Sequence, residues 1–116
     1  MKLKLIMAFV GDEHTAAVVD AAREAGATGA TVITSCRGEG LKPEKTFLGL
    51  DLSSHRDVLL FLVVEARARE ILETIAAAGN FDEEPGAGIA FEIAIEDAVG
   101  LKTQVATLLH EIEEDL

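Results

Sequence analysis

The sequence predicts an α+β fold of the ferredoxin-like type, in the order βαββαβ, with a long loop between the second and third strands and a helix at the C-terminus. Two observations support this prediction. An apolar strand, an amphipathic helix and a further strand occur in the first third of the chain, and the pattern recurs after residue 56. Each of the two helical segments also ends at a glycine, Gly26 or Gly79. Two such units in tandem place four strands in one sheet and both helices on one of its faces.

The first unit begins with an apolar and partly alternating strand over residues 2–10, which Gly11 and Asp12 interrupt. We expect Asp12 to cap the helix that follows over residues 13–25, because its short side chain can accept a hydrogen bond from a free backbone N–H. A run of β-branched residues then predicts the second strand over residues 30–37.

The second unit contains a nearly continuous apolar strand over residues 57–65 and an alanine-rich helix over residues 67–78. The fourth strand, residues 89–96, alternates apolar and acidic residues, which is typical of a strand with one solvated face. A last amphipathic helix is predicted over residues 103–116. The helix over 67–78 is expected to turn Ile71, Leu72 and Ile75 inward.

The connection between the two units, residues 38–56, is longer than most loops inside a compact domain. Residues 37–56 carry four basic and three acidic side chains, whereas the whole chain has a net charge of -11. An anion or an acidic partner would therefore meet the least repulsion at this segment. A solvated loop without a specific role is the alternative.

Composition excludes several classes of function. The 116 residues are 49% hydrophobic, which is enough for one domain, residues 1–116, with its own core. Twenty-one acidic against ten basic residues disfavour binding to nucleic acid or to an anionic membrane. A single cysteine forms no disulfide framework, and no apolar run is long enough to enter a membrane, so we expect a cytoplasmic protein. No nucleophile elbow, phosphate-binding Walker loop or HExxH motif indicates an enzyme.

Three segments resemble the nitrogen regulatory PII superfamily. Residues 32–40, Val-Ile-Thr-Ser-Cys-Arg-Gly-Glu-Gly, resemble the end of that family's second strand and the start of its long T-loop. Residues 82–88 occupy the place of its short nucleotide-gripping loop. Residues 95–103 are similar to its closing signature, a paired-acid turn followed by basic residues and a threonine. The order and spacing of the three segments extend the resemblance over nearly the whole chain.

The resemblance implies a signalling protein that binds a small ligand in a cleft between subunits of a homotrimer. It implies ligand-binding residues at the base of the long loop and in two later segments: Arg37, Gly38, Gly40, Gly86, Ala87, Gly88 and Lys102. Ile89 and Gly100 stand where the family has basic residues. Because fewer cations face the phosphates, we expect ADP, AMP or a small anion in preference to ATP.

The resemblance further implies that the long loop regulates a partner, either a membrane transporter or a metabolic enzyme. The residues themselves also point to a homotrimer, because the apolar third strand needs cover on both faces. An alternative function is a ferredoxin-like trimer of the copper-tolerance type that binds a divalent metal through acids and His110. A structural interaction module with an empty cleft is a third hypothesis.

Overall fold

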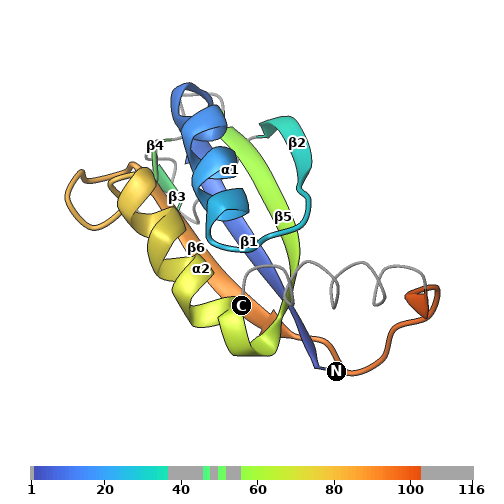
Figure 1. Ribbon diagram of the computed structural model, residues 1–116. Helices are drawn as coiled ribbons and strands as arrows, with labels where there is room; N and C mark the ends of the chain where they lie inside the picture. Colours follow the sequence, from blue (N-terminus) through green and yellow to red (C-terminus); the bar gives the residue numbers. More distant parts are fainter. Residues whose placement is uncertain (1, 37–45, 48–49, 52–55, 103–116) are drawn as a thin grey trace.

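The computed structural model describes residues 2–36, 46–47, 50–51 and 56–102, and it confirms the predicted α+β fold (Figure 1). One antiparallel sheet has the strand order β2-β5-β1-β6. Its members are β1 (Leu3–Gly11), β2 (Thr31–Cys36), β5 (Arg56–Val64) and β6 (Gly88–Ala94). Helices α1 (Thr15–Glu24) and α2 (Glu65–Ala78) both lie in front of the sheet in Figure 1. These strands and helices begin and end within one or two residues of the predicted bounds.

The long connection contains some regular structure that the sequence did not indicate. Strands β3 (Thr46–Phe47) and β4 (Leu50–Asp51) pair antiparallel as a separate two-stranded sheet. The rest of the loop predicted over 38–56, apart from Arg56, lies outside the described residues, as does the helix predicted over 103–116. None of the helices in the described part of the chain is long and apolar enough to cross a membrane.

The hydrophobic core lies between the sheet and the two helices. Ile6 of β1 is paired in register with Phe61 of β5, and both side chains are fully buried. Their neighbours on the same face, Ala8 and Leu59, are also fully buried. The helices contribute Val18, Ala22, Ala68, Ile71 and Ile75 to this core, and Leu72 packs against it at the margin. The predicted inward face of α2 is thus confirmed.

The opposite face of the sheet is also apolar, although neither α1 nor α2 covers it. Because side chains alternate along a strand, the residues between the core positions point to this second face. They include Leu5, Met7, Phe9, Val58, Leu60, Leu62, Ile89, Phe91 and Ile93. The rings of Phe9 and Phe91 lie 6.1 Å apart between centroids. Ile93 is 38% exposed and Ile33 is 46% exposed, so this open face presents large apolar side chains.

The start of α1 differs from the prediction. Asp12 belongs to a short 3-10 turn, η1 (Asp12–His14), and no side chain caps either η1 or α1 through a hydrogen bond. Instead, the buried carboxylate of Asp57 on β5 accepts a hydrogen bond from the Thr15 hydroxyl at 2.5 Å. A negative charge at the first turn of a helix is favourable because free N–H groups and the helix dipole face it. A residue 42 positions away thus supports the start of this helix.

The two helices end in similar ways, but with different residues in the left-handed conformation. After α1, Gly26 has a φ of 119°, and the Ala27 N–H bonds to the Ala22 carbonyl. After α2, Gly79 has a negative φ and the left-handed residue is Asn80, with a φ of 55°. The expectation that the two helices end at Gly26 and Gly79 is confirmed, although the left-handed residue after α2 is Asn80.

Candidate functional site

The segment between α2 and β6 forms a compact turn, here called the glycine loop and defined as residues 80–88. Its own backbone sets its shape. The Asn80 carbonyl accepts hydrogen bonds from the N–H groups of Glu83 and Glu84, and the Glu84 carbonyl accepts one from Ala87. These bonds close two short turns in succession, which bring the chain from the helix to the sheet.

Backbone conformation and packing explain why glycine occurs in and beside this loop. Gly86 has a φ of 77°, a backbone conformation that residues other than glycine rarely adopt. A Cβ on Gly88 would lie 2.4 Å from the ring of Phe81 and 2.7 Å from the Phe9 carbonyl oxygen. A Cβ on Gly79 would lie 2.3 Å from the same ring. Gly79 and Gly88 therefore make room for Phe81, and a ligand-binding role for Gly86, Ala87 and Gly88 stays a prediction.

Arg56 holds the glycine loop against the sheet. Its Nη2 donates a hydrogen bond to the Gly86 carbonyl at 2.8 Å, and its Nη1 donates one to the Ala87 carbonyl at 3.4 Å. The residue begins β5, 30 positions before the loop that it contacts. Sequence reasoning missed this role. The available signal was the charged pair of Arg56 and Asp57 at the start of a strand that is otherwise apolar.

An acidic group lies beside Arg56. Gly11 of β1 is paired in register with Arg56, and a Cβ on Gly11 would lie 2.6 Å from a carboxylate oxygen of Glu13. A hydrogen bond from its own backbone holds the pKa of the Glu13 carboxyl below the usual value, and the charges of His14 and Arg56 act in the same direction. Glu13 is thus an anion near the guanidinium of Arg56.

The structure does not bring Lys102 to the glycine loop. Gly88 is paired with Val10 near the end of β1, whereas Leu101 lines a hollow with Leu3 at the start of that strand. A strand of nine residues separates these ends by about 25 Å. One chain alone therefore cannot build a site from the glycine loop and Lys102. Arg37, Gly38 and Gly40 lie outside the described residues.

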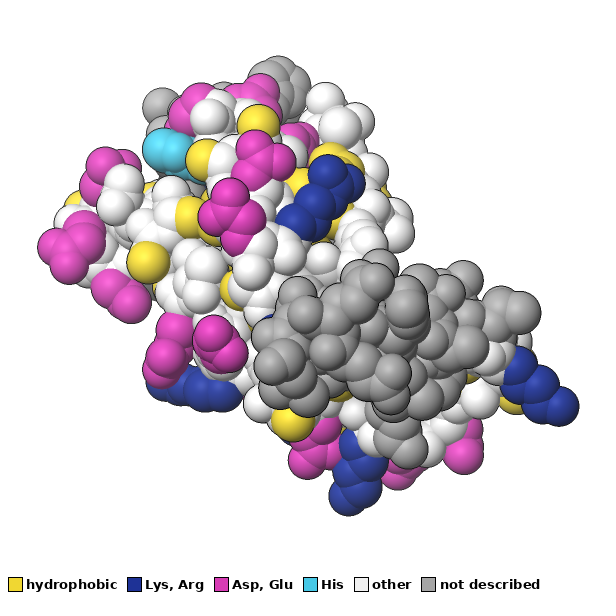
Figure 2. Space-filling model, in the orientation of Figure 1, with side chains coloured by type: hydrophobic (Ala, Val, Ile, Leu, Met, Phe, Trp, Pro, Cys, Tyr) yellow, Lys and Arg dark blue, Asp and Glu magenta, His cyan; other side chains and the backbone are white. Residues whose placement is uncertain are grey.

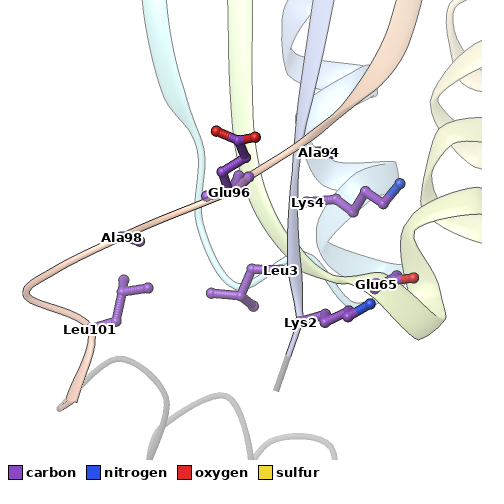
Figure 3. Close-up of a pocket in the computed structure, with 9 residues that line it drawn as sticks. Lys2, Leu3, Lys4, Glu65, Ala94, Glu96, Ala98 and Leu101 are labelled. Atoms are coloured by element: carbon purple, nitrogen blue, oxygen red, sulfur yellow. The ribbon is translucent and has the colours of Figure 1, made fainter.

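Two hollows in the described part of the chain could receive a small ligand. The larger, about 460 Å³, lies where residues 94–101 pass the starts of β1 and α2 (Figure 3). Its charged lining consists of Lys2, Lys4, Glu65 and Glu96. The smaller, about 230 Å³, lies beside the glycine loop, between α2 and β6. Its charged lining consists of Arg69, Glu73 and Asp82.

Neither hollow has the excess of positive charge that a phosphate group requires. The larger has equal numbers of basic and acidic side chains among its described lining. In the smaller, Arg69 donates to Glu73 at 2.9 Å and Asp82 adds a further acid. Acidic side chains are also widespread over the helix-bearing face (Figure 2). Among the described residues, no group of three histidine, cysteine or acidic side chains is arranged to hold a metal ion.

An antiparallel ferredoxin-like sheet with a long connection after β2 and a glycine loop before β6 is the architecture of PII-like signalling proteins. Comparison with known families agrees, because the model of the family "Nitrogen regulatory protein P-II" matches residues 3–105. The chain belongs to the nitrogen regulatory protein P-II family. No match was found among curated proteins.

Solved structures of PII-like proteins share the fold. A PII-like signalling protein from Thermus thermophilus is 23% identical, with a TM-score of 0.60 over 82% of this chain and 88% of its own. CPII from Thiomonas intermedia K12, bound to ADP, AMP and acetate, is 19% identical, with a TM-score of 0.59 over 83% of this chain and 90% of its own. The apo form of CPII, described as a nitrogen regulatory PII-like protein, is 19% identical, with a TM-score of 0.61 over 82% of this chain and 90% of its own.

The contact between Gly88 and Phe81 leads to a stability prediction. Gly88→Ala should lower the free energy of unfolding by about 1 to 3 kcal/mol, because the new methyl group overlaps a ring and a backbone carbonyl. Gly29→Ala is the matched control, since a Cβ there meets nothing within 4 Å, and it should be neutral or slightly stabilising. Urea denaturation of both variants measures the difference. Equal stability of the two variants would show that Phe81 does not require a glycine at position 88.

Proposed function

We propose that this protein is a PII-like signalling module that senses a small ligand between neighbouring subunits of a homotrimer. The ligand is ADP, AMP or a small anion, and the long loop transmits its presence to a membrane transporter or a metabolic enzyme. The observation that carries the proposal is the separation of the glycine loop from Lys102 in a chain of this family. If the glycine loop and Lys102 contact the same ligand, they belong to two different copies of the chain.

The open face of the sheet supports assembly. Its large apolar side chains would cost free energy if they stayed in water, at about 25 cal/mol for each Å². A second face of this kind is normally covered, and closure around a threefold axis covers all three copies with the same surface. Closed symmetry also leaves no further apolar surface for continued growth.

The few cations among the candidate ligand-binding segments support a ligand with few negative charges. Ile89 is a half-buried apolar residue, and Gly100 is an exposed residue with a φ of 83°. Neither position offers a cation to a phosphate group. Arg56 is close by, but two of its nitrogens donate to loop carbonyls. CPII of the same fold is known bound to ADP, AMP and acetate, which are a diphosphate, a monophosphate and a small anion.

Calorimetry with ADP, AMP, ATP and acetate tests the ligand. We expect heat of binding with ADP or AMP, and weaker binding of ATP. Lys102→Ala should weaken the binding of ADP about tenfold or more, because a charge-assisted contact is lost. Arg23→Ala is the control, since Arg23 is exposed on α1, lines neither hollow and should leave affinity unchanged. Absence of heat with all four compounds would contradict the proposal.

Light scattering with size-exclusion chromatography tests the assembly. We expect about three times the chain mass of 12.3 kDa, and no dissociation as salt is added, because salt screens the repulsion between acidic chains. Ile93→Glu should dissociate the trimer, since a charge would be buried on the open face. Val99→Glu is the control, because Val99 is 97% exposed and lies beyond the sheet. A stable monomer of the unaltered chain at micromolar concentration would overturn the assembly.

A further inference from the structure

Arg56 joins the glycine loop to the sheet through two side-chain hydrogen bonds. The turns within residues 80–88 set the shape of the loop, and its two ends are attached to α2 through the Phe81 N–H and to β1 through the pairing of Gly88 with Val10. The bonds from Arg56 to the carbonyls of Gly86 and Ala87 join the loop to β5. They hold two successive peptide groups, and because a peptide group is planar they also fix the direction of the Gly88 N–H, whereas the Ala87 N–H already donates to the Glu84 carbonyl.

The surroundings of Arg56 keep its guanidinium in this position. Arg56 is paired in register with Gly11 on β1 and with Cys36 on β2, so it lies at the end of the sheet between two neighbouring strands. Glu13 reaches over Gly11 and supplies a nearby negative charge. Arg56 therefore lies beside two segments, residues 11–13 and the end of β2, that are distant from it in sequence.

One feature of Arg56 is unfavourable for stability. Its Nε atom is buried and has no hydrogen-bond partner in the part of the chain that the structure describes. A buried donor without a partner costs free energy, so an apolar or shorter residue would relieve this cost. The two hydrogen bonds from Arg56 to the loop carbonyls have to offset this cost.

We propose that Arg56 is a positioning residue for the ligand of the glycine loop. It acts through the carbonyls of Gly86 and Ala87, whose peptide groups it turns and holds, and it does not itself contact the phosphate. This inference rests on the proposed function. It also separates two roles for an arginine beside a nucleotide, because a positioning residue affects all ligands of the loop equally, whereas a phosphate contact affects the more highly charged ligand more.

The test compares Arg56→Met and Arg56→Lys with Arg23→Met, which removes an exposed arginine from the last turn of α1 that lines neither hollow. In the absence of any ligand, Arg56→Met should speed amide hydrogen exchange at Ala87 and Gly88 about tenfold or more, because the tie to β5 is lost. Affinity for ADP and for AMP should fall by the same factor, about tenfold. Arg56→Lys should restore part of both effects, since an ammonium group can donate to the same carbonyls.

Each other outcome contradicts a stated part of the inference. Unchanged exchange in Arg56→Met would show that Arg56 does not hold the loop. A larger loss for ADP than for AMP would show a direct phosphate contact in place of positioning. A loss of affinity in Arg23→Met of the same size would show a general effect of charge. If the unaltered chain binds neither nucleotide, the proposed function is wrong, and the ligand-free exchange then decides alone whether Arg56 holds the loop.

Discussion

The constraint on which the rest of this structure depends is a four-stranded sheet with two apolar faces, of which the two helices in the described part of the chain cover only one. The face of the sheet toward the helices is covered, because Ile6, Phe61 and Leu59 are fully buried in the core that α1 and α2 share with the sheet. The other side presents leucine, isoleucine and phenylalanine from three strands. Burial of this second face would be favourable, and we propose that association of identical copies provides it. In the proposed trimer, the same association brings the glycine loop of one copy within reach of Lys102 of another, which one chain cannot do.

The start of β5 connects this sheet to the candidate site. Arg56 and Asp57 are consecutive residues, so their side chains point to opposite faces. Asp57 accepts a hydrogen bond from Thr15 at the start of α1, and Arg56 donates to the carbonyls of the glycine loop. Both contacts use charged groups in a partly or fully buried setting, where hydrogen bonds to charges are stronger than those between neutral groups. The residues that directly follow the long connection therefore tie together the first helix, the sheet and the glycine loop.

Sequence patterns were sufficient to predict the order of strands and helices, because apolar periodicity and terminal glycines are local signals. Sequence patterns did not predict the features that depend on contacts between residues distant in the sequence. Asp12 looked like a cap, but the start of α1 depends on Asp57, which lies 42 positions from Thr15. Gly88 looked like a ligand residue, but its lack of a side chain also accommodates the ring of Phe81. The role of Arg56 could not be read from its neighbours in sequence, because the contact exists only once β5 and the loop are placed side by side.

The most direct test of the account is whether two defective chains can restore a site by assembling together. Gly86→Val damages the glycine loop, Lys102→Ala removes the cation, and each chain alone should bind little ADP. In trimers formed from equal amounts of both, every mixed trimer has one interface with an intact loop and an intact lysine. Calorimetry should then recover about a quarter of the sites of the unaltered protein. Mixed trimers, verified by native mass spectrometry, that recover no binding would contradict a site shared between copies.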